Sequence, residues 1–288
     1  MGEYNAYGKK CYEYAIGRIK ATSHPVLTGE QWSRLREADL AGAVKLLEEY
    51  GYPKAEEGET VRDSIDKEMQ RAVSFILELA PDEELTNLLF FEEDALNLKL
   101  FLKSKLVKGH MDNLPVVEGS FSPELLRICA ETEDFSLLGK DLERELEGVG
   151  DMEDPFLISC TVDNAMFNHA VEGAAKKHCS ALKNLLTEYG AGRNRLIRMR
   201  MKRLGREAED FAYLPVSFSE YRAKDDKRTD DEILQDVNRR LSSVLTDLGY
   251  DDGMGVLAQY YFQKKNEAAA LRLLFARKSQ EATGGNDE

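Results

Sequence analysis

Residues 229–249, TDDEILQDVNRRLSSVLTDLG, carry the clearest secondary-structure signal in the chain. Thr229, followed three residues later by Glu232, forms a capping box, in which two side chains satisfy backbone amides at the start of a helix. Apolar residues then recur every three or four positions, which places them on one helix face: Ile233, Val237, Leu241, Val244, Leu245 and Leu248. Gly249 is expected to end this helix at the position where glycine adopts the left-handed conformation.

The same period recurs through most of the sequence. Thr60 and Asp63 give a similar start signal before an apolar stripe that Pro81 stops, and Ser122-Pro123 predicts the start of a further helix. No stretch shows the sustained alternation of apolar and polar residues, rich in β-branched side chains, that is typical of strands. We therefore predict an all-α protein.

Length and composition limit the class of protein. A chain of 288 residues with 42% hydrophobic residues can form one large domain or two to three small ones. The excess of 53 acidic over 39 basic residues gives a formal charge of −14, which argues against a general affinity for nucleic acid or anionic lipid. No apolar run approaches the roughly 20 residues that span a bilayer, so we expect a soluble protein.

The four cysteines are scattered and form no CxxC pair. This spacing favours neither a zinc cluster nor a disulfide framework, and reduced thiols in the cytoplasm are the plain interpretation.

Three segments share one pattern, in which an aromatic residue precedes an asparagine and a basic residue follows six positions after that asparagine. The asparagine and basic residues are Asn97 and Lys103, Asn194 and Arg200, and Asn266 and Arg272. We expect each asparagine near a helix start, where its side chain satisfies free amides, and each basic residue further along the helix. Ordinary helix chemistry that coincides three times is the alternative, because short degenerate patterns recur by chance.

The first of these segments, DALNLKLFLKSK (residues 94–105), resembles the D-x-x-N-L-K-x-x-L-[RK]-x-K segment found in the C subunit of V/A-type ATPases and in the homologous d subunit of eukaryotic V-ATPases. The segment YYFQKKNE (260–267), with Leu271-Arg272 and Lys278, is similar to the closing signature of that family, and LLEEYGY (46–52) fits its first domain. The order of these pieces carries the resemblance over most of the chain. The second repeat departs from the family, because Ala191-Gly192-Arg193 stand where an Asp-led stretch is usual.

The resemblance implies three related helical domains in a pseudo-threefold funnel, which we place at residues 1–112, 113–207 and 208–288. It also implies a non-catalytic connector that couples the rotor axle of a rotary ATPase to its membrane ring, which translocates protons or sodium ions. The partners would be the central axle subunits and the ring. The protein would be cytoplasmic and attached to the membrane through the complex, without inserting into it. A helical-repeat adaptor for an unrelated assembly is the alternative.

Motifs that carry chemistry are missing from the sequence. It contains no GxxxxGK[ST] phosphate-binding loop, no HExxH metal motif and no GxSxG nucleophile motif, so we expect no cofactor, no metal and no catalytic residue. The candidate partner-binding residues are Asn97, Lys103, Asn194, Arg198, Arg200, Asn266 and Arg272. We expect no binding of nucleic acid.

Residues 193–206 form a basic stretch in this acidic chain: Arg193, Arg195, Arg198, Arg200, Lys202, Arg203 and Arg206. One interpretation is a solvated helix whose charges pair with the acidic surface. A second is a positive lining of the funnel or a contact with acidic partner helices. RNA binding is the third, and the lack of nearby stacking aromatics in an acidic protein argues against it.

Overall fold

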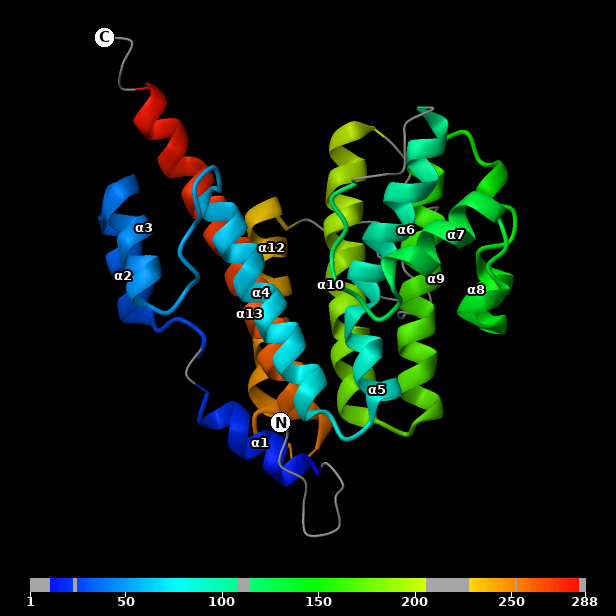
Figure 1. Ribbon diagram of the computed structural model, residues 1–288, viewed down its shortest axis with the longest axis horizontal. Helices are drawn as coiled ribbons and strands as arrows, with labels where there is room; N and C mark the ends of the chain where they lie inside the picture. Colours follow the sequence, from blue (N-terminus) through cyan, green and yellow to red (C-terminus); the bar gives the residue numbers. More distant parts are fainter. Residues whose placement is uncertain (1–10, 23–24, 108–113, 206–227, 252, 285–288) are drawn as a thin grey trace. The chain divides into compact units, whose positions relative to one another are not determined.

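The computed structural model describes residues 11–22, 25–107, 114–205, 228–251 and 253–284, and every regular element in these ranges is a helix (Figure 1). The all-α prediction is therefore confirmed. Contacts between the helices divide the chain into two compact units. The first unit combines Met1–Pro81 with Gly255–Glu288, and the second comprises Asp82–Met254.

The first unit contains α1 (Tyr12–Lys20), α2 (Gly29–Glu37), α3 (Leu40–Glu49), α4 (Val61–Leu79) and nearly all of α13 (Met254–Gly284). The capping box predicted for α4 is present, with the amide of Thr60 donating to the Asp63 carboxylate at 2.7 Å. The same helix ends before Pro81, as predicted. Ala80 is extended, at φ −60° and ψ 125°, because proline disfavours a helical conformation in the residue before it.

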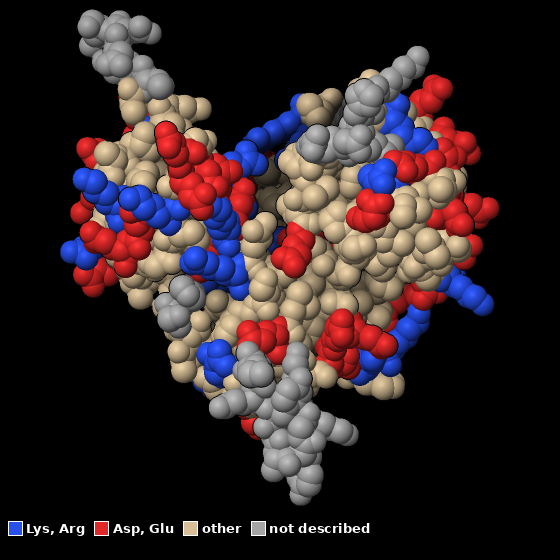
Figure 2. Space-filling view, in the orientation of Figure 1, with Lys and Arg blue, Asp and Glu red and all other residues tan. Residues whose placement is uncertain are grey.

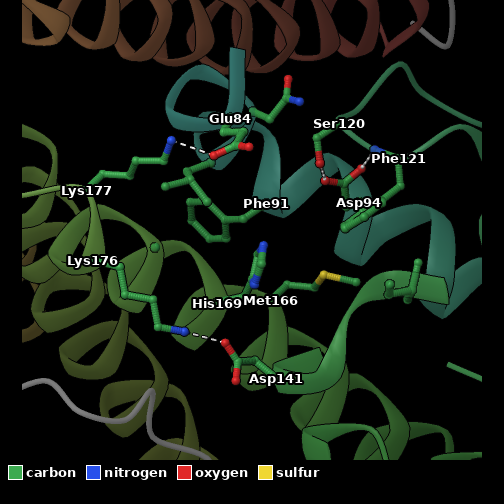
Figure 3. A pocket seen from close by; sticks show the side chains of 14 residues that line it. Glu84, Phe91, Asp94, Ser120, Phe121, Asp141, Met166, His169, Lys176 and Lys177 are labelled. Carbon is green, nitrogen blue, oxygen red and sulfur yellow. Dashed lines mark hydrogen bonds and ion pairs between the residues drawn. The ribbon is translucent and has the colours of Figure 1, made fainter. Parts of the chain in front are cut away.

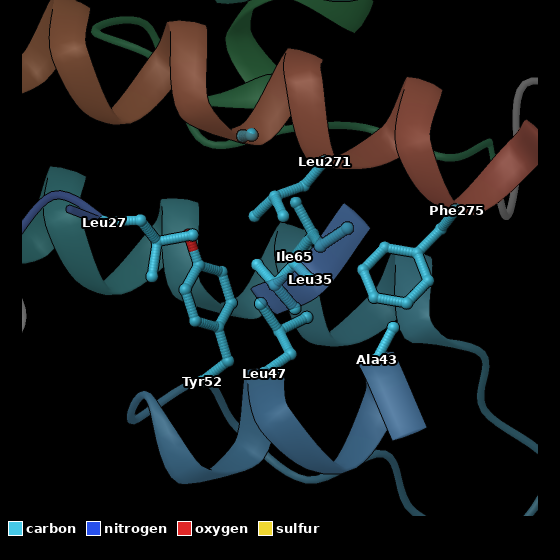
Figure 4. Packing of buried hydrophobic residues seen from close by; sticks show 9 residues of the cluster. Leu27, Leu35, Ala43, Leu47, Tyr52, Ile65, Leu271 and Phe275 are labelled. Carbon is cyan, nitrogen blue, oxygen red and sulfur yellow. The ribbon is translucent and has the colours of Figure 1, made fainter. Parts of the chain in front are cut away.

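Helices α2, α3, α4 and α13 of the first unit surround one apolar cluster (Figure 4). Its buried members are Leu27, Leu35, Ala43, Leu47, Tyr52, Ile65, Ala268, Leu271 and Phe275. Helices of nine or ten residues, such as α2 and α3, are marginal on their own in water. The α2–α3 pair therefore depends on the area that it buries against α4 and α13.

The second unit contains α5 (Glu83–Asn87), η1 (Leu88–Phe90), α6 (Phe91–Leu106), α7 (Pro123–Thr132), η2 (Ser136–Leu138), α8 (Lys140–Glu145), η3 (Val149–Asp151), α9 (Pro155–Lys176), α10 (Ser180–Leu204) and α12 (Asp230–Leu248). Helix α9 packs against both α6 and α10, α12 packs on α10, and α7 packs on α6. Phe91 of α6 meets Phe167 of α9 edge to face, with ring centroids 5.7 Å apart.

Helices α10 and α12 approach each other closely at Gly192. A Cβ atom added to Gly192 would lie 2.9 Å from Cγ1 of Val237, which belongs to the predicted apolar stripe of α12 and is buried. Gly192 is also part of the stretch that departs from the family pattern in the second repeat. The close packing of α10 against α12 therefore explains why a residue without a side chain occupies position 192.

Helix α12 confirms its predicted start and corrects its predicted end. The amide of Thr229 donates to Glu232 at 2.7 Å, as the capping box requires. The expectation of a left-handed Gly249 is wrong, because this residue has φ −65° and ψ −15°. The amides of Gly249 and Tyr250 instead bond to carbonyls three residues earlier, which closes the helix with a tighter turn.

The predicted domain boundaries at 112/113 and 207/208 fall on residues outside the described ranges. The division into three domains and their funnel arrangement therefore stay predictions.

Candidate interaction surface and its polar contacts

Two motif residues of α6 bind the backbone of the segment that leads into α7. Asn97, which is fully buried, donates to the Val117 carbonyl at 2.8 Å and accepts from the Val117 amide at 3.0 Å. Asp94 is 1% exposed and accepts from the amide of Phe121 at 3.0 Å and from the hydroxyl of Ser120. Burial raises the pKa of Asp94 to about 7. We call Asp94 and Asn97 the α6 clamp.

The three lysines of the same motif bind neighbouring helices of the second unit. Lys99 contacts Asp163 and Lys103 contacts Ser159, both on α9. Lys105 donates to a main-chain carbonyl in the last turn of α7 at 3.1 Å, where the negative end of the helix dipole favours a cation. The polar residues of this family-like motif therefore join α6 to its own unit.

A second cluster of buried polar residues lies in the first unit. Lys264 of α13 is 3% exposed, and its ammonium group lies 3.0 Å from Glu68 of α4 and 3.2 Å from Glu267. It also donates to the carbonyl of Pro25 at 3.3 Å and lies 5.3 Å from the centre of the Tyr52 ring. A buried ammonium group is tolerated when it is paired and hydrogen-bonded in this way.

Glu267 connects two of the family-like segments in space. Its carboxylate accepts from the hydroxyl of Tyr52 at 2.5 Å and from the amide of Leu27, which precedes the N-cap residue of α2. Burial, together with the negative charge of Glu267, raises the pKa of Tyr52. Tyr52 comes from LLEEYGY and Glu267 from YYFQKKNE, so these distant segments meet at one hydrogen bond. We call Lys264 and Glu267 the α13 clamp.

The two clamps have the same construction. Each consists of two buried polar residues three positions apart on a long helix, and each binds backbone just before the N-cap of a shorter helix. In this comparison Glu267, and not Asn266, corresponds to Asn97. Lys264 and Glu267 could have been identified from the sequence, because they stand at positions where the helical period predicts buried residues.

The expectation that the repeated asparagines lie near helix starts is wrong. Asn97 lies in the middle of α6, Asn194 in the second half of α10, and Asn266 inside α13. Backbone amides at such positions are already bonded within the helix. The side chain of Asn97 therefore binds a different segment of the chain.

The structure distributes the seven candidate partner-binding residues between buried and exposed positions. Asn97, Lys103 and Asn194 make internal contacts or are buried, Arg198 is half-buried, and Arg200, Asn266 and Arg272 are exposed. Arg272 binds Asp66 of α4 at 2.5 Å. The structure does not gather these residues into one site, and their role in partner binding stays a prediction.

The basic stretch is partly paired with acidic residues of the second unit. Arg195 lies 3.7 Å from Asp236 and Arg203 contacts Asp230, both on α12. Arg200 is exposed, and Arg206 lies outside the described residues. On the face seen in Figure 2, acidic and basic side chains are interspersed and separated by broad uncharged areas. These contacts favour a solvated helix for part of the stretch.

The second unit also contains a cavity of about 390 Å³ (Figure 3). Its apolar lining is Leu88, Phe91, Phe121, Leu138 and Met166. Burial lowers the pKa of His169 in this lining, which favours the neutral form of its imidazole. Lys176 with Asp141 and Lys177 with Glu84 form ion pairs at the same cavity, the second at 2.5 Å. Both lysines at the cavity are therefore paired with carboxylates, and Asp94 of the α6 clamp lines the cavity as well.

Among the described residues, no group of three or more His, Cys, Asp or Glu side chains is placed to hold a metal ion. Within the same ranges, none of the helices is both long and apolar enough to cross a membrane.

The protein is thus all-helical, and Asp94 and Asn97 of its family-like motif bind backbone groups of the same chain. The family described as ATP synthase (C/AC39) subunit matches residues 15–231, and the chain belongs to this family. The resemblance to the C subunit of V/A-type ATPases is thereby confirmed, and with it a place among the subunits of a rotary ATPase. A search of curated proteins found no significant match.

Proposed function

We propose that this chain is the central-stalk connector that couples the rotor axle of a V/A-type rotary ATPase to its membrane ring. The observation that carries the proposal is the family match over residues 15–231. The role is mechanical and non-catalytic, because other subunits hydrolyse or form ATP and the ring translocates protons or sodium ions. The chain acts in the cytoplasm and is held at the membrane by the axle and the ring.

The two clamps support a mechanical role. A connector that transmits torque has to keep its helices in register under load. Breaking a clamp leaves buried polar groups without partners, at about 1–3 kcal/mol for each group. The α6 clamp and the α13 clamp place such bonds where α7 and α2 begin, so both short helices resist displacement.

The test of this function asks whether the chain bridges the axle and the ring. In cells that lack the chain, a tagged axle subunit is purified after gentle solubilisation, and its partners are identified by mass spectrometry. We expect ring subunits to be lost from this sample and to return when the wild-type chain is supplied. Ring recovery without the chain would contradict the proposal, and recovery of unrelated partners by the tagged chain would favour a helical-repeat adaptor.

Arg200 is the sharpest of the predicted partner contacts to test, because it is exposed on α10. Arg200→Glu is expected to weaken recovery of the axle or ring while leaving the melting temperature unchanged. Arg144→Glu is the matched control, because Arg144 is an exposed arginine of the same unit. Equal recovery of partners by both variants would remove Arg200 from the proposed interface.

A further inference from the structure

The cavity of the second unit has the volume and the lining of a small-molecule site. It measures about 390 Å³, whereas an apolar cavity of about 150 Å³ is enough to hold benzene. Its apolar wall includes two aromatic rings and a thioether, from Phe91, Phe121 and Met166. In Figure 3 the ring of Phe91 points toward His169 and Met166. A ligand with fused aromatic rings therefore finds both room and favourable ring and sulfur contacts there.

The charged side chains at the exposed edge of the cavity are paired with one another. Each lysine there has two acidic neighbours within 3.9 Å: Asp141 and Glu172 at Lys176, and Glu84 and Asp82 at Lys177. Neither ammonium group is therefore open to an anionic ligand. Asp94 is 1% exposed, and its two oxygens accept from Ser120 and Phe121, so it offers little surface to a cationic ligand. The cavity therefore suits a neutral ligand, because a charged one would also lose its hydration against the apolar wall.

His169 contributes a polar group with open hydrogen-bonding capacity to the cavity wall. Its half-buried ring lies 6.5 Å from the ring of Phe121, measured between centroids. Within the part of the chain that the structure describes, its imidazole makes no hydrogen bond. Burial lowers the pKa of His169, and a neutral imidazole carries one donor and one acceptor. A single polar group of this kind in an apolar wall can fix the orientation of a bound ring.

We propose that this cavity binds a neutral aromatic small molecule whose hydroxyl or carbonyl group forms a hydrogen bond with His169. The bound molecule lies against Ser120 and Phe121, which line the cavity and are held by Asp94 of the α6 clamp. It thereby shields the hydrogen bond between Asp94 and Phe121 from water and steadies the segment that leads into α7. All lining residues belong to the second unit, and the site does not depend on the proposed connector role.

The test uses three probes that differ in one substituent, which are 2-naphthol, naphthalene and 2-naphthoate. Their fluorescence measures binding to the full chain. We expect 2-naphthol to bind about threefold to tenfold more tightly than naphthalene, because it gains one hydrogen bond, and 2-naphthoate to bind more weakly than either. In isotope-labelled protein, 2-naphthol is expected to shift the imidazole resonances of His169 and to slow hydrogen exchange at the Phe121 amide.

A pair of histidine variants shows whether the probe occupies this cavity. His169→Phe keeps a ring in the wall but removes the hydrogen-bonding group, so it is expected to bind 2-naphthol and naphthalene equally. His178→Asn is the matched control, because His178 is exposed outside the cavity lining and asparagine tolerates its φ of 54°. The control is expected to bind both probes as the wild type does. Should circular dichroism show that His169→Phe is unfolded, His169→Gln keeps a donor and an acceptor and should retain the preference for 2-naphthol.

Several outcomes would overturn the proposed site. Absence of 2-naphthol binding up to its solubility limit would leave the cavity to water, and an unchanged preference for 2-naphthol in His169→Phe would place the binding elsewhere. Tighter binding of 2-naphthoate or of 2-naphthylmethylamine would contradict a neutral ligand. The axle–ring purification is a separate experiment, so failure of the cavity site leaves the connector role standing.

Discussion

Replacing Asn97 by alanine tests the α6 clamp directly. The change removes two hydrogen bonds to Val117, each with a net contribution of about 1 kcal/mol. If the Val117 amide and carbonyl stay buried without a partner, the cost is instead about 1–3 kcal/mol for each group. Since Val117 is half-buried and water can reach part of it, we expect Asn97→Ala to lower the free energy of unfolding by about 2–4 kcal/mol.

The chain provides a matched control in Asn266, the corresponding asparagine of the predicted repeat. Asn266 is exposed, so Asn266→Ala is expected to change the free energy of unfolding by no more than about 0.5 kcal/mol. Urea unfolding followed by circular dichroism measures both variants. Hydrogen exchange at the Val117 amide gives a local readout, and a loss of about 2 kcal/mol corresponds to exchange roughly thirtyfold faster.

Similar stability of Asn97→Ala and Asn266→Ala, together with a Val117 amide as protected as in the wild type, would contradict this role of Asn97. In that case the hydrogen bonds of Asn97 would be incidental to the packing of α6 and α7.

Three further predictions concern the clamps and the α10–α12 contact. Burial raises the pKa of Asp94 to about 7, so the folded protein favours the protonated carboxyl group. The stability that this protonation contributes is present below about pH 4 and is lost as the pH rises through 7. Urea titrations across this range measure the loss. Lys264→Met should lower the free energy of unfolding by about 3–5 kcal/mol, since two buried carboxylates lose their cation, as chemical denaturation will show. Gly192→Val should lower the melting temperature, because its first side-chain atom would lie 2.9 Å from Val237.

Each of these predictions has its own control. Asp94→Asn keeps the shape of the side chain and should abolish the loss of stability between pH 4 and 7; an unchanged pH dependence would assign it to other groups. Lys265→Met, next to Lys264 but half-buried, should cost much less. Gly17→Ala meets no atom within 4 Å, so it should stabilise α1 slightly, and a similar loss in both glycine variants would contradict the packing argument.

The clamps add specific hydrogen bonds to the apolar packing of α7 and α2. Apolar side chains hold two helices against each other, but the hydrophobic effect itself is non-directional. A hydrogen bond to a specific backbone group adds a requirement on distance and angle. Asn97 binds the Val117 amide ahead of α7, and Glu267 binds the Leu27 amide ahead of α2, so each fixes the segment from which that helix begins.

The start signals of several helices and the resemblance to the family are visible in the amino-acid sequence. Helix starts such as Thr60–Asp63 and Thr229–Glu232 depend on contacts within four residues, so their patterns are readable from the chain alone. The prediction of a left-handed Gly249 at the end of α12 is wrong, because a helix can also end in a tighter turn and the glycine alone does not distinguish the two.

The role of the repeated polar residues depends on contacts that form only in the folded chain. Asn97 and Asn266 look alike in the sequence, yet one is buried against a backbone segment 20 residues away and the other faces solvent. The partners of Lys264 and Glu267 lie about 200 or more residues away in the chain, at Glu68, Pro25, Leu27 and Tyr52. Local propensity carries no information on such distant contacts, because burial depends on which helix faces meet after the chain has folded.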